Sequence, residues 1–192
     1  MILLHICCGP CSLYPIKILR EKGFKVIGFF YNPNIHPYRE FRERIKALET
    51  ISQLKNFEVI WDKNYGLRMF LEKVKFRKEW PERCEICYYI RLKETAKKAI
   101  EIKAEAFTTT LLYSIYQNHQ LIIDIAEDLS FRYKIPFYYE DFRIGYKQGQ
   151  EEAKNLDVYR QGYCGCIFSE EERYYKKRRK EIIAKIKSLK QV

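Results

Sequence analysis

Residues 2–22 read ILLHICCGPCSLYPIKILREK, and this stretch shows the building unit of the whole chain. Ile2–Ile6 is a short apolar run, which predicts a buried strand. Ser12–Lys22 has apolar residues at helical spacing, and Gly23 follows it as a stop signal. The stretch therefore predicts a strand that leads into a helix through a cysteine-containing loop.

The same alternation of strands and helices continues along the chain. We predict further strands at Lys25–Tyr31, Phe57–Trp61, Ala106–Leu112 and Pro136–Tyr139. We predict further helices at Tyr38–Leu54, Tyr65–Val74, Cys84–Ile102 and Leu121–Tyr133, and a basic helical tail over about residues 169–192. Short strands separated by helices indicate an α/β fold, with a Rossmann-like parallel sheet and helices on both faces. No repeat or linker divides the chain, so we expect one domain over residues 1–192.

Composition narrows the class of protein. With 47% hydrophobic and 32% charged residues, the 192-residue chain is typical of neither disordered nor membrane proteins. Its longest apolar stretches, such as Val26–Tyr31, are too short to span a bilayer, and the absence of a signal peptide predicts a cytoplasmic protein. The net charge of +11 favours a polyanionic partner such as nucleic acid. The alternative is the Lys/Glu-rich surface of a heat-adapted protein, which explains many charges but not their imbalance.

All seven cysteines fall into three tight groups. They are Cys7, Cys8 and Cys11 in HICCGPC, Cys84 and Cys87 in RCEIC, and Cys164 and Cys166 in YCGC. Clustered thiols favour metal binding or redox chemistry over scattered core positions. A disulfide framework is the other interpretation, but it is typical of smaller, secreted and more cysteine-rich domains.

The first group lies where ligands bind in open parallel sheets, at the carboxyl end of the first strand. The positive end of the following helix favours anions there, so a thiolate should be stabilised. Only Gly9 stands in this loop, whereas ATP or NAD loops of the usual kind contain several glycines.

The other two groups leave alternatives open. Zinc ribbons, clusters and redox pairs all use a C-x-x-C pair such as Cys84 and Cys87. Adjacent cysteines suit a tetrahedral zinc site poorly, whereas a four-iron cluster tolerates varied spacing and suits Cys7, Cys8, Cys84 and Cys87. Cys164 and Cys166, one residue apart, could form a strained, readily reduced disulfide or provide two further metal ligands.

These motifs identify a resemblance. Six motifs occur here in the order found in the epoxyqueuosine reductase family known as QueH, which the chain resembles over most of its length. They are HICCGPC, FYNPNIHPYREFRER, RCEICYYIRL, FTTTLLYSIYQN, DFRIGYKQG and VYRQGYCGCIF. The resemblance implies reduction of epoxyqueuosine in tRNA to queuosine, the last step of queuosine biosynthesis, and a fold like that of ATP-pyrophosphatase/HUP-type tRNA thiolases. One departure is Tyr113-Ser114-Ile115-Tyr116, where a Ser-Pro-type segment is expected.

The resemblance also implies cofactors and roles. Cys7, Cys8, Cys84 and Cys87 would hold a [4Fe–4S] cluster, and Cys164 and Cys166 would form a redox-active disulfide. Cys11 joins them as a catalytic candidate with an open role. An external electron donor is required, and the oligomeric state and an additional mononuclear iron beside the cluster are left open.

Removing the epoxide oxygen as water takes two electrons and two protons, and a proton donor or an iron with a free position would help the C–O bonds to open. Candidate donors are Asp62 after the third strand, Asp141 after the fifth, and Tyr163 beside the dithiol. Each has a structural alternative, since aspartates often form turns or caps and a tyrosine can simply pack.

A basic and aromatic stretch, RYYKKRRK at residues 173–180, predicts a surface for RNA phosphates and bases, and a solvated helix is the alternative. His36 is predicted at the surface, where it could stack on a base, and Arg39, Arg42 and Arg44 form a second candidate surface for tRNA.

Two other functions are compatible with parts of the sequence. A cluster-dependent tRNA thiolase would need a Ser-Gly-Gly loop after the first strand, where this chain has cysteines. A non-catalytic, zinc-dependent RNA-binding protein is the other candidate, and its metal content would distinguish it.

Overall fold

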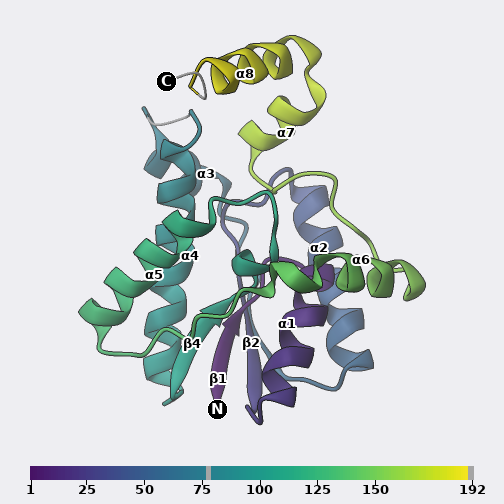
Figure 1. Cartoon of the computed structure of the whole chain (residues 1–192), viewed down its shortest axis with the longest axis vertical. Helices are drawn as coiled ribbons and strands as arrows, with labels where there is room; N and C mark the ends of the chain where they lie inside the picture. The colour runs from purple at the N-terminus through teal and green to yellow at the C-terminus, as the bar shows by residue number, and fades with distance from the viewer. Residues whose placement is uncertain (77–78, 190–192) are drawn as a thin grey trace.

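A parallel sheet lies at the centre of the computed structural model, which describes residues 1–76 and 79–189 (Figure 1). Its four strands are β1 (Ile2–His5), β2 (Val26–Tyr31), β3 (Val59–Asp62) and β4 (Ala106–Thr109), in the order β3-β2-β1-β4. His5 pairs with Phe29 on one side and Thr109 on the other, so the carboxyl ends of the strands meet at one edge. The central position of β1 explains its entirely apolar, buried start.

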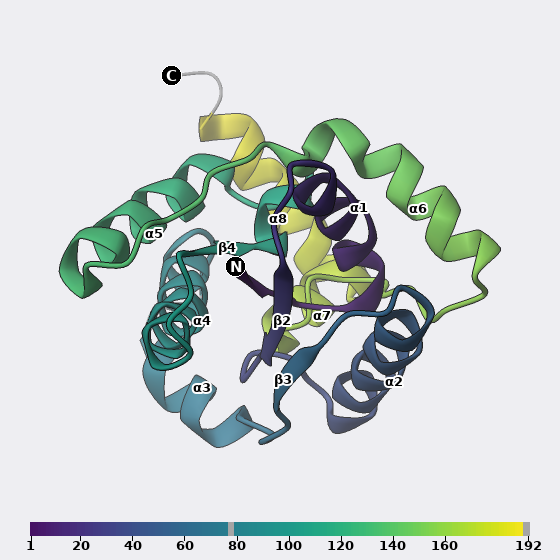
Figure 2. The same ribbon diagram turned by 90° about the horizontal axis from the view of Figure 1, so that it is seen from below.

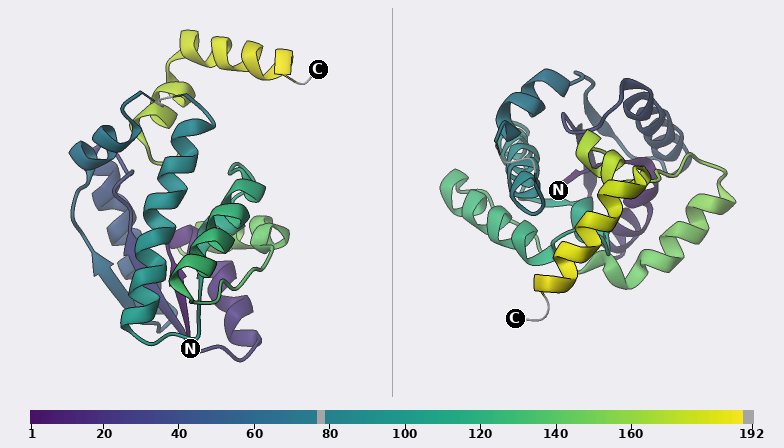
Figure 3. Two further views of the ribbon diagram at one scale, coloured as in Figure 1. Left: turned by 90° about the vertical axis from the view of Figure 1, so that its left-hand side faces the viewer. Right: turned by 90° about the horizontal axis from the view of Figure 1, so that it is seen from above.

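Helices cover both faces of the sheet, as Figures 2 and 3 show. On one face, α1 (Gly9–Glu21) packs against α2 (Tyr38–Leu54) and α6 (Tyr146–Asn155). On the other, α4 (Glu82–Glu101) packs against α5 (His119–Tyr133) and the short α3 (Leu67–Val74). The predicted α/β architecture with a parallel sheet is therefore confirmed.

Two hydrophobic clusters fill the interior. The main one combines the strands with the inner faces of the helices. His5 of β1 is also buried, and its Nδ1 is hydrogen-bonded to Thr109 Oγ1 at 2.9 Å. The smaller one contains Phe70, Val74, Cys87 and Cys166. Two of the seven cysteines thus lie in an apolar cluster of their own, beside the main core.

Two predicted strands and one helix differ from the structure. The strand predicted at Ala106–Leu112 ends at Thr109, because Thr110–Tyr113 form the 3-10 helix η1. Pro136–Tyr139 is not a strand, because its pairing ends after one bridge between Phe137 and Phe107. Pro136 has no N–H to donate, and Asp141 soon caps the short helix η2 (Phe142–Gly145), so the chain turns away from the sheet. The helix α6 was not predicted, because its polar sequence buries only Gly149 and Ala153.

The basic tail is helical, but it is not one helix. It consists of α7 (Ile167–Tyr174) and α8 (Lys176–Leu189), which Figure 1 shows at the top of the view. Tyr175 between them has an extended backbone, with φ −79° and ψ 101°. Residues 190–192 of the predicted tail lie outside the described residues. Across residues 1–76 and 79–189, every helix is too short or too polar to cross a membrane.

Candidate thiol site at the carboxyl edge of the sheet

The N-terminal thiol group consists of Cys7, Cys8 and Cys11. It lies where β1 leads into α1, with extended Cys8 as the N-cap residue. The three sulfur atoms all lie within 4.8 Å of one another, and those of Cys7 and Cys8 are 3.8 Å apart. Gly9 lets α1 approach α2 closely, since a Cβ there would lie 2.7 Å from the Ala47 carbonyl oxygen.

Neighbouring polar groups orient these thiols. Thr110 Oγ1 accepts a hydrogen bond from the Cys7 backbone N–H at 3.1 Å and donates to Cys7 Sγ at 3.4 Å. Gln161 Nε2 donates to Cys11 Sγ at 3.2 Å. Hydrogen bonds from Cys11 and Cys8 lower the pKa of Cys7, while burial raises the pKa of Cys8 and the bond to Cys7 raises that of Cys11. Within this group, the neighbouring thiols thus favour the anionic form of Cys7.

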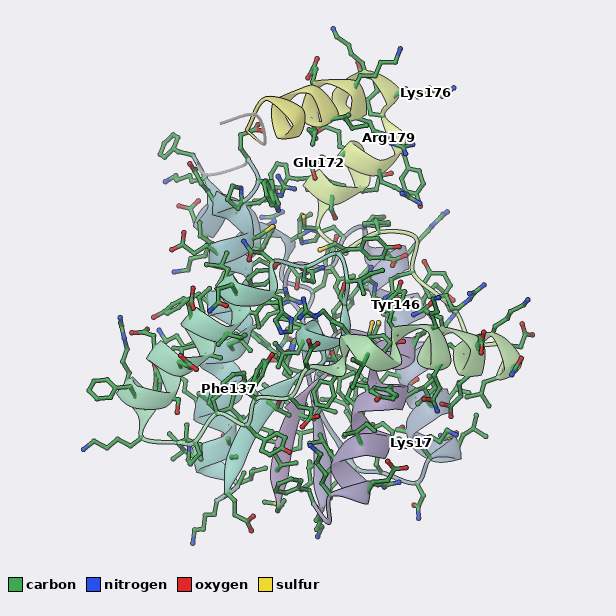
Figure 4. All side chains as sticks on the ribbon, in the orientation of Figure 1. Lys17, Phe137, Tyr146, Glu172, Lys176 and Arg179 are labelled. Atoms are coloured by element: carbon green, nitrogen blue, oxygen red, sulfur yellow. The ribbon has the colours of Figure 1, made fainter. Side chains whose placement is uncertain are left out.

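The second thiol group consists of Cys84, Cys87, Cys164 and Cys166. The first two lie in the opening turns of α4, and the other two lie in the segment that enters α7. Cys166 is the N-cap residue of α7, and its sulfur accepts a hydrogen bond from the Ser169 N–H at 3.3 Å. Figure 4 shows sulfur atoms beside Tyr146 and also below α7.

Burial and mutual contacts set the protonation of this second group. Burial raises the pKa of Cys84 to about 12 and that of Cys87 to about 11. The hydrogen bond from Cys166 lowers the pKa of Cys164 and raises that of Cys166. Cys164 is therefore the thiol of this group that ionises first.

Arg91 connects the two groups electrostatically. It is buried on α4, one turn beyond Cys87, and its Nη2 lies 3.1 Å from Cys87 Sγ. Its positive charge also lowers the pKa of Cys164 and acts on Cys7. A buried cation next to thiols from three parts of the chain favours their anionic forms.

Arg44 holds the segment that carries the dithiol. This residue of α2 is only 1% exposed, and its Nη1 and Nη2 donate to the carbonyl oxygens of Cys164 and Tyr163 at 3.0 and 2.9 Å. Its Nε donates to Glu40 Oε1 at 2.7 Å, and Tyr159 donates to the other carboxylate oxygen of Glu40. Arg44 is thus a clamp inside the protein, and the hypothesis that it contacts tRNA phosphates is wrong.

His36 is also inside the protein, so its predicted surface position is wrong. Its backbone N–H donates to the Gly165 carbonyl oxygen at 2.7 Å, and its ring packs against Tyr65 and Phe70. Gly165 itself has φ +129°, a conformation that favours glycine between the two cysteines. The loop after β2 therefore helps to fix the Cys164–Cys166 segment.

The three candidate proton donors occupy structural positions. Asp62 accepts hydrogen bonds from the backbone and side-chain nitrogens of Asn64, as in an Asx turn. Asp141 caps η2 and pairs with Arg143, which lowers its pKa. The Tyr163 hydroxyl donates to the His36 carbonyl oxygen, and burial raises its pKa. Proton donation by these residues stays a prediction. Asp62 lies in a turn and Asp141 at a helix cap, which are the structural alternatives given above for the two aspartates.

The sequence did not point to the side chains that support the thiols. These are Arg44, Arg91, Thr110, Gln117 and Gln161. Arg91 alone had a usable signal, because it follows Cys87 by four residues on a helix and so lies on the same face. Thr110 and Gln161 approach the N-terminal group from distant parts of the chain.

The donor set fits a metal or cluster bound by soft ligands. Thiolates are the ligands of zinc and iron–sulfur centres, and the N-terminal group already holds three within 4.8 Å of one another. Arg91 and Arg44 add buried positive charge, which an anionic thiolate centre requires.

Comparisons with known proteins agree with this chemistry. The family model described as "Epoxyqueuosine reductase QueH" matches residues 2–172. The chain is 38% identical over 175 residues to the epoxyqueuosine reductase QueH of Dehalococcoides mccartyi, covering 91% of this chain and 95% of that protein. It is 36% identical over 183 residues to that of Thermotoga maritima, covering 90% and 91% of the two chains.

A solved structure shows the same fold at low identity. It is described as a predicted subunit of tRNA methyltransferase from Methanocaldococcus jannaschii, and it superposes with a TM-score of 0.54 at 16% identity. The match covers 80% of this chain and 75% of that one. At this identity the likeness concerns the fold alone.

Proposed function

Because this chain belongs to the epoxyqueuosine reductase QueH family, we propose that it reduces epoxyqueuosine in tRNA to queuosine, the last step of queuosine biosynthesis. Family membership makes the protein an oxidoreductase. The observation that supports this substrate chemistry is the gathering of seven thiols in two groups linked by Arg91. The epoxide oxygen leaves as water, and the two carbons form a double bond, when two electrons and two protons are supplied.

We propose that Cys7, Cys8, Cys84 and Cys87 hold a [4Fe–4S] cluster, for which these soft thiol donors, two buried and two half-buried, are suitable. A cluster bound there would supply electrons one at a time. Thr110 keeps Cys7 in position through two hydrogen bonds, and Arg91 compensates negative charge at Cys87. Cys11 then stays as a third thiol of the N-terminal group, available for proton transfer.

The dithiol of Cys164 and Cys166 would match the two-electron demand of the reaction. Oxidation of two thiols to a disulfide releases two electrons and two protons, which is what the epoxide consumes. Arg44 holds the carbonyl groups of Tyr163 and Cys164, and Gly165 allows the tight turn between the two sulfur atoms. An external electron donor would then reduce the disulfide again.

The tRNA would be held by basic residues around this edge. Lys176, Lys177 and Arg179 at the start of α8 are exposed, in accordance with a phosphate-binding role. The side chain of Arg178, also predicted for this role, lies outside what the structure describes. Since the proposed substrate is tRNA, we propose that the protein acts in the cytoplasm.

Anaerobic purification followed by an activity assay tests this function. We expect a brown protein that contains iron and sulfide and that, with a chemical reductant, converts epoxyqueuosine in tRNA to queuosine, measured by mass spectrometry of the nucleosides. A colourless protein with stoichiometric zinc and no conversion would contradict the proposal and favour the RNA-binding alternative.

The dithiol has its own test in the same assay. A Cys164→Ser, Cys166→Ser protein should keep its iron and colour but lose multiple turnover. Loss of the iron would identify these thiols as ligands, and full turnover would show that they take no part.

A further inference from the structure

An exposed aromatic surface lies close to the thiol groups. We call Tyr116, Tyr139, Ile144 and Tyr146 the platform. Tyr116 is 77% exposed and Ile144 is 80% exposed. Tyr116 and Tyr146 meet edge to face, with ring centroids 6.1 Å apart. The ring of Tyr139 lies 5.9 Å, between centroids, from that of His119, which follows Tyr116 by three residues. Figure 4 shows Tyr146 at the start of α6.

The platform connects to the N-terminal thiol group through tyrosines in contact with one another. Tyr146 lies 5.3 Å from Tyr113 between ring centroids, and the Tyr113 hydroxyl donates to the Tyr146 carbonyl oxygen at 2.9 Å. Burial first, then the hydrogen bond and charge of Tyr116, and last the nearby thiols of Cys11 and Cys8 raise the pKa of Tyr146 to about 12. The inner rim of the platform is therefore next to the proposed reaction site.

The segment that carries Tyr116 also touches both thiol groups. Thr110 in the helix η1 (Thr110–Tyr113) bonds to Cys7, and Gln117 bonds to Cys164 and accepts a hydrogen bond from Tyr88 at 2.6 Å. Tyr116 is the direct neighbour of Gln117, but its ring points to solvent. A ligand that stacks on Tyr116 therefore lies one residue away from the group that bonds to the dithiol.

The charge around the platform fits an RNA ligand. Lys147 is exposed next to Tyr146, and the chain has a net charge of +11. Arg143 is exposed next to Ile144, where it pairs with Asp141. Aromatic rings flanked by cations are how proteins bind single-stranded nucleic acid, because bases stack on the rings while cations meet phosphates. Recognition of single-stranded RNA uses the same splayed-out bases.

We propose that the nucleobases flanking the reduced nucleotide stack on the platform, with Tyr116 and Ile144 as its outer contacts. This inference rests on the proposed function, since it assumes that the reacting nucleotide lies at the thiol groups. It predicts an unpaired segment of RNA as the bound form, because paired bases have no free face to offer.

Direct binding of tRNA, measured without turnover, separates the platform from the reaction. Tyr116→Ala should weaken tRNA binding about tenfold, since base stacking on an aromatic ring is worth about that factor. Tyr116→Phe keeps the ring and should bind nearly as well as the original protein. Ile144→Glu, which adds a negative charge to the platform, should weaken binding at least as much as Tyr116→Ala.

Phe131 on α5 provides the matched control. It is 87% exposed and belongs to no part of the platform, so Phe131→Ala and Phe131→Glu should bind tRNA normally.

In turnover, Tyr116→Ala should raise KM for whole tRNA far more than for the free epoxyqueuosine nucleoside. Equal binding by Tyr116→Ala and the original protein would overturn the proposal, and so would equal losses on both substrates. If tRNA binds as expected but no substrate is reduced, the proposed reaction fails and the platform stands.

Discussion

The two thiol groups are built in different ways. Cys7, Cys8 and Cys11 lie within one turn between a central buried strand and its helix, so the backbone alone brings their sulfur atoms together. Cys84 and Cys87 meet Cys164 and Cys166 only because α4 and the segment before α7 pack together. The first group is therefore a property of local sequence, and the second is a property of the tertiary fold.

In the second group, contacts of buried charged side chains hold the cysteine-bearing segments in position. Arg44 holds the Tyr163 and Cys164 carbonyl groups, and Arg83 on α4 pairs with Glu172 on α7. Charges buried in this way need well-placed partners, since removing one partner leaves the other uncompensated. We expect the second group to be the more sensitive of the two to substitutions outside the cysteines themselves.

The largest effect should come from the cysteines assigned to the cluster. Cys7→Ala and Cys84→Ala should each lose iron and activity to background, although they lie in different groups, because a cluster that lacks a ligand is not retained. Iron and sulfide analysis after anaerobic purification measures this. Cys11→Ala is the control from within the N-terminal group and should keep its iron.

The opposite pattern would change the assignment. If Cys11→Ala loses iron while Cys84→Ala keeps it in full, the N-terminal group holds the metal without α4. The second group would then be a redox site only.

The sequence predicted the first group better than the second, because the first depends on local sequence and the second on tertiary packing. Apolar runs identified β1 and β2, so the position of Cys7 at the carboxyl edge followed from topology. The burial of Arg44 could not be predicted, because Glu40 and Arg44 have the spacing of an ordinary surface ion pair on a helix. Its carbonyl partners lie more than a hundred residues further along the chain.

An intermediate effect is expected for Arg44→Lys. Lysine keeps the charge but lacks the planar fork that reaches two carbonyl groups and Glu40 at once. The variant should fold and keep its iron, while turnover falls about a hundredfold, since small misplacements of reacting groups have effects of that size. Titration of the Cys164–Cys166 pair against a thiol buffer should show a shifted midpoint, which loss of stability alone would not produce.

Arg20→Lys is the matched control for this clamp. Arg20 also donates from both terminal nitrogens to two carbonyl oxygens, those of Lys55 and Asn56, but it is exposed and remote from the thiols. It should leave turnover and the thiol midpoint unchanged. If Arg20→Lys and Arg44→Lys have equal effects, Arg44 contributes only to general stability. If Arg44→Lys keeps full activity, Arg44 has no role in positioning the dithiol.

The smallest effect concerns α8, which follows the second group through α7. Lys176→Gln together with Lys177→Gln should reduce the salt dependence of tRNA binding, with the slope of log K against log salt falling by about 0.7 to 0.9 for each phosphate that the protein no longer neutralises. Lys17→Gln with Lys25→Gln makes the same change in net charge from α1 and the residue before β2, and Figure 4 shows Lys17 and Lys176 at opposite ends of the molecule. This control pair should leave the slope near that of the original protein. If both pairs lower it equally, the tRNA responds to overall charge and α8 is a solvated helix. If only the α8 pair lowers it, the tRNA lies against the end of the molecule where the second thiol group is assembled.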